Sequence, residues 1–424
     1  MSRTSEDEGV DPRDKKKKEK TRRPGNTAFK QQRLKAWQPI LTPKTVLPLF
    51  FAVGIIFAPI GGLLLWASEQ VQELVIDYTE CASGIGSNRD FVRIPAEKIQ
   101  RNFYKPTVET KQDPQWKFVS NVTRIGNRQV NNTVCTLKFQ LEADMTAPVL
   151  LYYRLTNFYQ NHRRYVKSVN EEQLRGNAVG AGTLDTSESC APLAVDSAGK
   201  IIYPCGLMAN SVFNDTFGSP VLVQKRGGTG SEEEIYEMTN KGIAWPSDRD
   251  RYGVSKYNIS QIVPPPNWIN KFPNGYNSTN LPDLRDWEEL QVWMRTAGLP
   301  TFSKLARRND TKTMQSGVYT LDIKMNFPVT LYGGTKSIVL STRTVMGGKN
   351  PFLGIAYIVV GGLCVLLGVI FTARHLFKPR FVQLSHKLKP RKALTNYLAT
   401  ENLVITHTSA GKTGQLSVLL QDVI

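Results

Sequence analysis

The fold of this 424-residue chain depends on two stretches, TVLPLFFAVGIIFAPIGGLLLWAS at 45–68 and NPFLGIAYIVVGGLCVLLGVIFTA at 350–373, neither of which contains a charged residue. An α-helix rises about 1.5 Å per residue, so roughly 20 apolar residues cross the hydrocarbon core of a bilayer. Buried helices of soluble proteins seldom run this long without a charge, and we therefore predict two transmembrane helices. The first stretch follows a long charged tail, so we interpret it as a retained anchor rather than a cleaved signal peptide.

The net charge of +18 does not indicate a nucleic-acid-binding protein, because of where the charges lie. The tails outside the two apolar stretches carry +13 of it, from 21 basic and 8 acidic residues. The large middle segment is nearly neutral, with 33 basic and 28 acidic residues. We therefore expect no nucleic-acid partner, and we interpret the polybasic run at 15–23 as a disordered tail or a weak contact to anionic lipid.

Basic residues flank the two spans unevenly, and this bias predicts the orientation of the chain. Eleven Lys and Arg residues lie in 25–44 and 374–393, against three in 68–87 and 330–349. Both termini are therefore predicted to be cytosolic. The predicted segments are a disordered basic tail at 1–27, a pre-membrane segment at 28–44, a glycosylated exoplasmic domain at 69–349 and a cytosolic tail at 374–424.

Glycosylation motifs and cysteines agree with this placement. Six N-x-[ST] sequons lie in the middle segment and none in either tail: Asn121, Asn131, Asn214, Asn258, Asn277 and Asn309. The middle segment also holds all but one of the cysteines: Cys81, Cys135, Cys190 and Cys205. An even number of cysteines in an oxidising compartment indicates two disulfides, for which three connectivities are possible. The fifth cysteine, Cys364, lies in the second span.

The pattern of the middle segment indicates a β-rich domain. Apolar and polar residues alternate at 133–142 and 319–327, which is typical of half-buried antiparallel strands, and 148–156 and 337–342 are also predicted strands. One helix is predicted, with its N-cap at Asp283 and its stop at Gly298 and Pro300. The Gly- and Pro-rich region 176–282 is expected to form loops. The predicted fold class is a large antiparallel β-sandwich-like exoplasmic domain with helical and loop insertions, flanked by two transmembrane helices.

The sequence offers few residues for catalysis or metal binding. Of four histidines, His162 alone lies in the middle segment, too few for a His-based triad or zinc site. Gly411-Lys412-Thr413 imitates the end of a phosphate loop, but Thr406 stands where the first glycine is required. We therefore expect no catalytic residue, metal or cofactor. A tethered glycosidase stays open as an alternative, because the middle segment has enough acidic residues for a carboxylate pair.

Glycines recur at heptad spacing in both spans: Gly54 and Gly61 with Ser68, and Gly354, Gly361 and Gly368. Seven residues is close to two helical turns, so each set forms a smooth stripe that another helix can approach closely. We interpret the stripes as docking surfaces for helices of a partner subunit; the alternative is that glycine is common in membrane helices. Neither span contains an ionisable side chain, so the two helices are poor candidates for moving solutes themselves.

Six blocks of sequence resemble the cell-division-control-protein-fifty family, also called the ligand-effect-modulator family. The blocks are NTAFKQQRLKAWQPILTP at 26–43, NFYQNHRRYVKS at 157–168, PCGLMANSVFNDTF at 204–217, GIAWPSD at 242–248, VWMRTAGLPTF at 292–302 and LSTRTVMGGKNPFLGIAYIVVGG at 340–362. The resemblance extends over about residues 26–375. Members of this family are non-catalytic beta subunits of type-four P-type ATPases, the phospholipid flippases.

The resemblance implies a fold, a partner and a role. It implies an exoplasmic β-sandwich that clasps the outer loops of the catalytic ATPase in a heterodimer, with the two helices beside its membrane domain among the membrane lipids. It implies that the chain escorts the ATPase from the endoplasmic reticulum toward the Golgi, endosome or plasma membrane and supports its transport cycle. It also implies the pairs Cys81–Cys135 and Cys190–Cys205, and it marks Asn214 as the sequon most expected to carry a glycan.

Two further groups of residues are candidates for partner binding. Arg163 and Arg164 end an aromatic-rich block, and they either pair with an acid inside the domain or contact acidic outer loops of the ATPase. Trp37, with Phe29 and Leu34, places apolar residues among basic ones at 28–40, which is typical of an interfacial segment under the membrane. The main alternative from another class is a two-span trimeric ligand-gated channel, although such channels usually have more ectodomain cysteines and polar pore residues.

Overall fold

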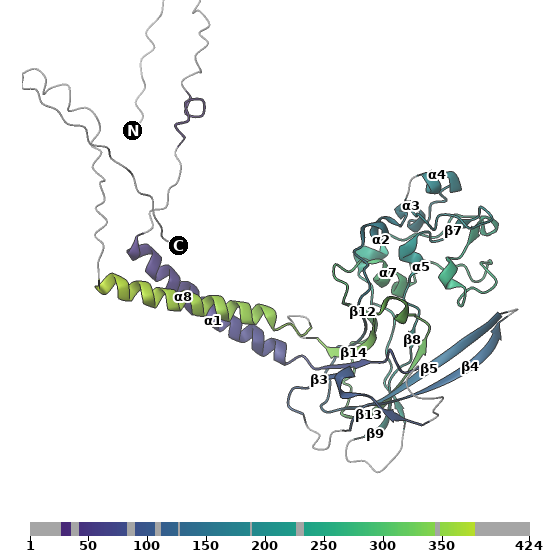
Figure 1. The fold of residues 1–424 in the computed structure, drawn as a ribbon, viewed down its shortest axis with the longest axis horizontal. Coiled ribbons are helices and arrows are strands. Elements are labelled where there is room, and N and C mark those ends of the chain that lie inside the picture. The colour runs from purple at the N-terminus through teal and green to yellow at the C-terminus, as the bar shows by residue number, and fades with distance from the viewer. Residues whose placement is uncertain are drawn as a thin grey trace, which may run out of the picture. The chain divides into compact units, whose positions relative to one another are not determined.

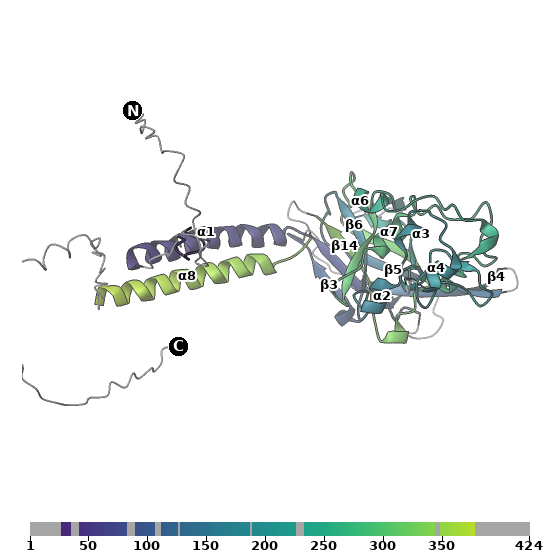
Figure 2. The same cartoon turned by 90° about the horizontal axis from the view of Figure 1, so that it is seen from above.

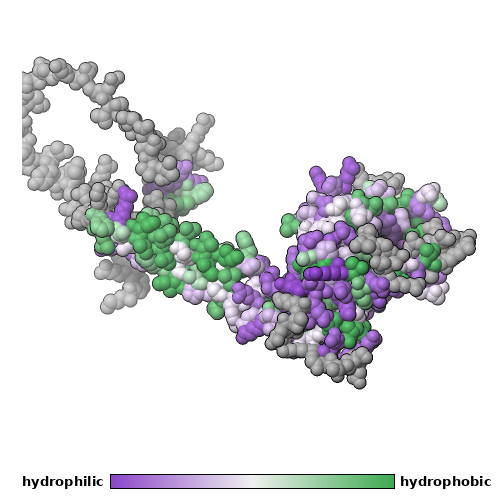
Figure 3. All heavy atoms as spheres, turned by 60° about the horizontal axis from the view of Figure 1, so that its bottom comes forward, coloured by the Kyte–Doolittle hydropathy of each residue, from purple (hydrophilic) through white to green (hydrophobic). Residues whose placement is uncertain are grey.

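The computed structural model describes residues 27–34, 42–82, 90–106, 112–125, 128–186, 189–225, 233–343 and 348–377. Two helices in these ranges, α1 (Pro43–Glu69) and α8 (Phe352–Phe377), are long and apolar enough to cross a membrane. Between them lies a β-rich domain with short helices (Figure 1). Large apolar side chains of both helices point to the surface, and Figure 3 shows these helices as a mostly hydrophobic band. A hydrophobic outer surface on an unbroken helix is what a bilayer favours.

The first sheet has five antiparallel strands in the order β12-β6-β14-β1-β3. Their bounds are β1 Glu73–Asp77, β3 Ile99–Asn102, β6 Val149–Leu155, β12 Phe302–Asn309 and β14 Lys336–Thr342. The first and last strands of this sheet along the chain pair directly, with Glu73 opposite Ser341 and Asp77 opposite Ser337. All seven residues of β14 are buried, because this strand is central in the sheet and covered on both faces.

The second sheet is also antiparallel and runs β10-β9-β13-β5-β4-β2, with β8 pairing with β13 off this path. Its strands are β2 Val92–Arg93, β4 Gln115–Ile125, β5 Arg128–Leu141, β8 Thr216–Phe217, β9 Val221–Lys225, β10 Glu234–Ile235 and β13 Gly317–Met325. Cys135, Leu137, Phe139 and Leu141 of β5 are buried on one face. This is the alternation that the sequence predicted, and the long β4–β5 hairpin is plain in Figure 1.

The insertions between β6 and β12 hold short elements and a third, parallel pair of strands, β7 (Ile201–Ile202) and β11 (Ile262–Val263). The helices are α2 Arg163–Lys167, α3 Glu171–Leu174, α4 Ala181–Thr186, α5 Leu207–Asn210, α6 Pro246–Arg249 and α7 Glu288–Met294. Single 3-10 turns occur at Ala96–Lys98, Ile259–Gln261, Pro266–Trp268 and Thr330–Tyr332. Large aromatic side chains of the insertions extend the core of the domain: Tyr203, Trp268 and Trp293 are almost completely buried.

The predicted helix begins later than expected. Asp283 caps a turn instead, because its Oδ1 accepts the Arg285 N–H at 3.0 Å and its carbonyl accepts the Asp286 N–H. Helix α7 starts at Glu288, after Trp287, and ends at Met294. The four predicted strands are confirmed as β5, β6, β13 and β14. The predicted fold class, an antiparallel β-rich domain with helical insertions between two candidate membrane helices, is confirmed as well.

Candidate functional site

The glycine stripes of the two long helices pack against each other. A Cβ built on Gly61 would lie 2.8 Å from the carbonyl oxygen of Gly354, and one on Gly54 would lie 3.0 Å from that of Gly361. Gly62, one position along, meets nothing within 4 Å. Figures 1 and 2 show α1 and α8 side by side in both views. Close approach of backbones at small residues is the usual way for helices to associate in a membrane.

The sequence predicts that Gly54, Gly61, Gly354 and Gly361 receive helices of a partner. In the structure each of them packs against the other helix of the same chain, and a contact with a partner stays a prediction. The physical reason is that two matched smooth stripes in one chain are already tethered, so they meet before a second chain does. The chain also joins the two helices at the ends next to the β-rich domain, where the Asn350 N–H donates to Ser68 Oγ at 3.0 Å. Gly368 is buried, and its role toward a partner stays a prediction.

Both disulfides are those implied by the resemblance. Cys81 is bonded to Cys135 and Cys190 to Cys205, with Cα–Cα distances of 6.1 and 5.5 Å. The first joins the segment after β1 to β5, and so links the two sheets. The second closes a loop within the insertions. In the chain-entropy description of cross-links, loops of these lengths stabilise the fold by about 4 and about 3 kcal/mol.

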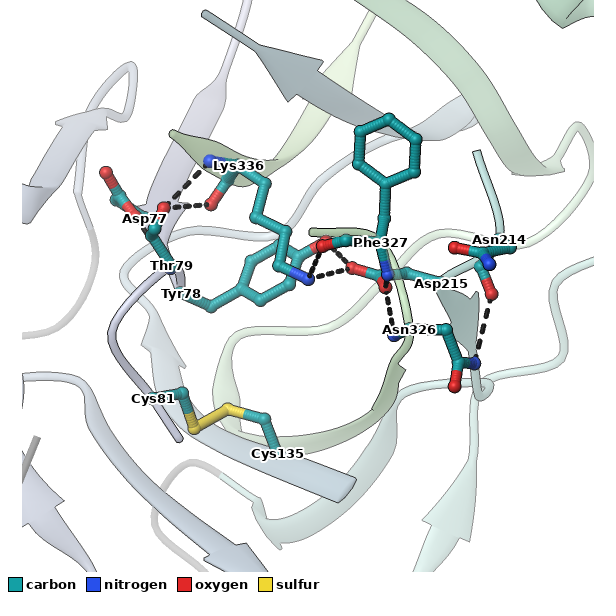
Figure 4. Close-up of polar contacts among 10 residues, drawn as sticks. All are labelled: Asp77, Tyr78, Thr79, Cys81, Cys135, Asn214, Asp215, Asn326, Phe327 and Lys336. Atoms are coloured by element: carbon teal, nitrogen blue, oxygen red, sulfur yellow. Dashed lines mark hydrogen bonds and ion pairs between the residues drawn. A yellow bond between two sulfur atoms is a disulfide. The ribbon is translucent and has the colours of Figure 1, made fainter. Parts of the chain in front are cut away.

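A buried ion pair lies near the first disulfide and also links the two sheets (Figure 4). Lys336, the first residue of β14, donates from Nζ to Asp215 Oδ2 at 2.7 Å and to the Phe327 carbonyl at 2.9 Å. Asp215 precedes β8, in the other sheet. Asp215 Oδ2 also accepts the Tyr78 hydroxyl at 2.9 Å, and Oδ1 accepts the N–H groups of Asn326 and Phe327 at 2.5 and 2.7 Å. Every oxygen of this carboxylate is therefore satisfied.

The environment of this network is strongly desolvated. The side chains of Lys336 and Asp215 are 4% and 0% exposed. Burial raises the pKa of Tyr78 well above its usual value, and the neighbouring charge of Asp215 raises it further. A buried pair of this kind contributes to stability only while both partners are present, because removal of either leaves an uncompensated charge. Sequence reasoning missed this pair, although Asp215 stands in the middle of the Asn214 sequon.

The predicted glycosylation sites differ in what the fold leaves accessible. Asn121, Asn258 and Asn277 are exposed, and the Oδ1 atoms of Asn258 and Asn277 accept the backbone N–H two residues later. Asn309 is 9% exposed, and its Nδ2 donates to the Glu237 carbonyl at 2.7 Å. Asn309 is therefore the least accessible of the described sequons, and its glycosylation stays a prediction. The side chain of Asn131, in β5, lies outside the described residues.

Arg163 and Arg164 begin the short helix α2, and both are exposed. Among the residues that the structure describes, neither forms an ion pair or a side-chain hydrogen bond. The alternative in which they pair with an acid inside the domain therefore finds no partner among the described carboxylates, and the contact with the ATPase stays a prediction. The segment before the two arginines is exposed at Tyr159. Asn161 Nδ2 of this segment donates to the Gly298 carbonyl at 2.9 Å, and the neighbouring Leu299 is also exposed. The two arginines therefore stand on a surface of mixed cationic and apolar character.

The pre-membrane candidates are described only in part. Phe29 and Leu34 are exposed, while Trp37 lies outside the described residues. Its predicted interfacial role stays a prediction. The described ranges contain no group of three or more His, Cys, Asp or Glu side chains that could hold a metal ion.

A second buried lysine, Lys304 of β12, has a different environment. Its Nζ donates to the carbonyls of Val292 at 2.9 Å, Trp293 at 2.8 Å and Arg295, which lie at the C-terminal end of α7. Burial and the neighbouring charge of Arg295 lower the pKa of Lys304 to about 7. Free carbonyls at a helix end attract a cation, so this side chain ties α7 to the first sheet.

Comparison with known proteins agrees with this architecture. The model of the LEM3 (ligand-effect modulator 3) family / CDC50 family matches residues 64–381. The chain is 44% identical over 363 residues to the phospholipid-transporting ATPase accessory subunit CRF1 of Saccharomyces cerevisiae, covering 85% of this chain and 87% of that one. It is 42% identical to the phospholipid-transporting ATPase accessory subunit CDC50 of Chaetomium thermophilum, covering 84% of this chain and 88% of the relative.

An animal relative extends the comparison. The chain is 40% identical over 365 residues to cell cycle control protein 50A of Bos taurus, covering 83% of this chain and 88% of that one. The residues matched by the family model, 64–381, include the end of α1, the whole β-rich domain and α8. With its family model, its full-length relatives and its arrangement of helices, sheets and disulfides, this chain belongs to the LEM3 (ligand-effect modulator 3) family / CDC50 family.

Proposed function

We propose that this chain is the non-catalytic accessory subunit of a phospholipid-transporting P-type ATPase, with which it forms a heterodimer. The observation that carries the proposal is the match, over 84–85% of this chain, to two fungal proteins named as accessory subunits of phospholipid-transporting ATPases. ATP hydrolysis and lipid movement belong to the catalytic partner. The accessory chain supports folding of the partner, its export from the endoplasmic reticulum and its transport cycle.

The proposed orientation places both termini in the cytosol and the β-rich domain on the exoplasmic side. It is supported by the excess of basic residues at the ends of the spans next to the chain termini and by sequons confined to the middle segment. The two disulfides of that domain are typical of an oxidising compartment. The complex resides in the endoplasmic reticulum and then in the Golgi, endosome or plasma membrane.

The proposed contacts with the ATPase come from two places. Arg163 and Arg164 contact acidic outer loops of the partner, since both cations are exposed and unpaired among the described residues. The paired helices α1 and α8 dock as one unit beside the membrane domain of the partner, because their glycine faces are already engaged with each other. The segment around Trp37 contacts the cytosolic side of the partner.

The experiment that tests this proposal is affinity purification of the full chain in mild detergent. The expected result is a one-to-one complex with a much larger phospholipid-transporting ATPase, and ATPase activity that depends on co-expression of both chains. The Arg163→Glu/Arg164→Glu variant should lose the large partner, while the matched variant Lys324→Glu, at an exposed lysine on β13, should retain it. A homotrimer that conducts ions would overturn the proposal; no observation favours that two-span channel.

A further inference from the structure

A cavity of about 370 Å³ opens beside the Asn214 sequon. Its walls combine aromatic side chains with amides and charges, from Phe213, Trp268, Asn270, Lys271, Trp287 and Asn326. These residues come from the loop before β8, from the 3-10 turn Pro266–Trp268 and its continuation, from the start of α7 and from the end of β13. The cavity therefore borders both the second sheet and the insertions.

The aromatic wall of this cavity is held rigid. The indole N–H of Trp268 donates to the Ala209 carbonyl at 2.8 Å, and the ring of Trp268 meets that of Trp287 edge to face at 4.9 Å. Lys271 Nζ lies 3.4 Å from the centre of the Trp287 ring. Phe213 stacks on Tyr153 with ring centres 3.9 Å apart. Side chains fixed in this way form a cavity before any ligand enters, which keeps the entropic cost of binding low.

The side chain of Asn214 is oriented unusually for a free asparagine. Its Oδ1 is buried and has no hydrogen-bond partner. Its Nδ2 forms no hydrogen bond to a described residue either, but it keeps some solvent-accessible surface. The backbone around it is fixed, because the Asn214 carbonyl accepts Asn326 Nδ2 at 3.2 Å and Asp215 holds the neighbouring strand. The nitrogen that would carry a glycan is thus open, and the oxygen beside it lacks a donor. A buried acceptor without a donor calls for an explanation.

We propose that the first sugar of a glycan on Asn214 occupies this cavity. An N-acetylglucosamine ring has an apolar C–H face that packs on aromatic side chains, and a rim of hydroxyl and acetamido groups that bonds to amides and charges. Because the sugar is covalently attached to the cavity wall, its effective concentration is high and a small contact area is enough to hold it.

The other accessible sequons provide the contrast. Asn258 and Asn277 are exposed in tight turns closed by their own Oδ1 atoms, and neither lines this cavity. Glycans there extend into solvent. The glycan on Asn214, by contrast, acts as a structural element that joins the insertions around Trp268 and Trp287 to the second sheet.

This inference rests on the proposed exoplasmic orientation, since glycans are added outside the cytosol. The first experiment therefore maps glycan occupancy by mass spectrometry of the full chain, co-expressed with its ATPase in a glycosylating yeast. No glycan on any sequon would overturn the orientation and this inference together. Glycans on Asn258 or Asn277 with Asn214 unmodified would overturn this inference alone.

The second experiment measures how fast the enzyme PNGase F, which cleaves the bond between Asn and the first sugar, removes each glycan from the native complex. We expect release from Asn214 to be about tenfold slower than from Asn258 or Asn277, because cleavage requires local opening of the cavity. After denaturation the release rates at Asn214, Asn258 and Asn277 should become equal, because the unfolded chain protects none of them. Equal native rates at Asn214 and at the exposed sequons would overturn the inference.

Variants of the cavity wall assign any protection to this cavity. Trp287→Leu should raise the native rate at Asn214 toward that of the exposed sites and leave Asn277 unchanged. The matched control is Trp245→Leu, at a tryptophan that is exposed and does not line the cavity. Asn270→Ala, at an exposed polar residue of the wall, tests the same contact if Trp287→Leu does not fold. Protection that survives both wall variants would contradict the proposed location of the sugar.

Discussion

Lys336 and Lys304 are both buried in the β-rich domain, but they face opposite kinds of partner. Lys336 meets the carboxylate of Asp215 at 2.7 Å and so neutralises a charge from the other sheet. Lys304 meets carbonyl oxygens at the end of α7, and no described carboxylate pairs with it. The comparison shows that burial alone does not determine what a lysine contributes. A carboxylate makes it part of an obligatory pair, whereas carbonyls leave its charge only partly compensated.

The largest expected effect is that of Lys336→Met. This change leaves Asp215 buried and unpaired, and we expect the free energy of unfolding to fall by about 3–5 kcal/mol. Thermal unfolding of the purified full chain in detergent measures the loss, with Lys324→Met at an exposed position as the control. If both variants unfolded at the same temperature, the ion pair would not link the sheets as described.

Lys304→Met should cost less than Lys336→Met. It leaves carbonyls of α7 without their donor, which costs roughly 1–3 kcal/mol, but it leaves no buried charge behind. The same unfolding measurement ranks the two variants. A loss at Lys304 as large as that at Lys336 would refute the distinction between the two sites.

The stability of the domain should depend on pH because of Lys304. The pKa of this side chain is about 7 in the folded state, below the ordinary value of 10.5, so the unfolded chain binds more protons between these values. The free energy of unfolding therefore rises with pH in this window, by about 1 kcal/mol between pH 7 and pH 8. Lys304→Met should remove this rise; its persistence in the variant would assign it to another group.

Above about pH 10 the slope should reverse. Burial raises the pKa of Tyr165 to about 12, so the folded state there retains a proton that the unfolded chain releases, and stability falls as pH rises. This fall in stability does not depend on Lys304 and should be present in the Lys304→Met variant too.

The smallest effect on stability is expected for the exposed cations. Arg163→Glu/Arg164→Glu should change the free energy of unfolding by no more than about 0.5 kcal/mol, because neither side chain has a described partner to lose. Denaturant unfolding of the same preparations used for co-purification provides the measurement. A large loss would show that these arginines serve the fold, as the two buried lysines do, rather than a partner.

The sequence predicted most of what depends on periodicity and composition. The length of the two uncharged stretches predicted both spans, and the alternation of apolar and polar residues predicted β5 and β13. It missed β12, whose sequence FSKLARRN places Lys304, Arg307 and Arg308 in a strand. Their charges are compensated by groups distant in sequence, such as the Met238 carbonyl that accepts from Arg307 at 3.0 Å, so no local pattern reveals them.

The site residues follow the same division. Cysteine pairing followed from the resemblance, and the sequons marked Asn214 but gave no reason to notice its neighbour. Asp215 meets Lys336 across 121 positions of sequence, a contact that only the paired sheets create. Heptad glycines likewise predicted a smooth helix face, but the spacing is the same whether the face meets another chain or, as here, the other helix of the same chain.

The pairing of β1 with β14 has a consequence for how the protein is made. β1 is the first strand after α1 and β14 the last before α8, so Glu73 cannot find Ser341 until nearly all of the intervening chain has been synthesised. Contacts of such long range form slowly and leave strand edges open in the meantime. Until β14 has been synthesised, the first sheet lacks its central strand, and the edges of β1 and β6 that it will pair with stay open.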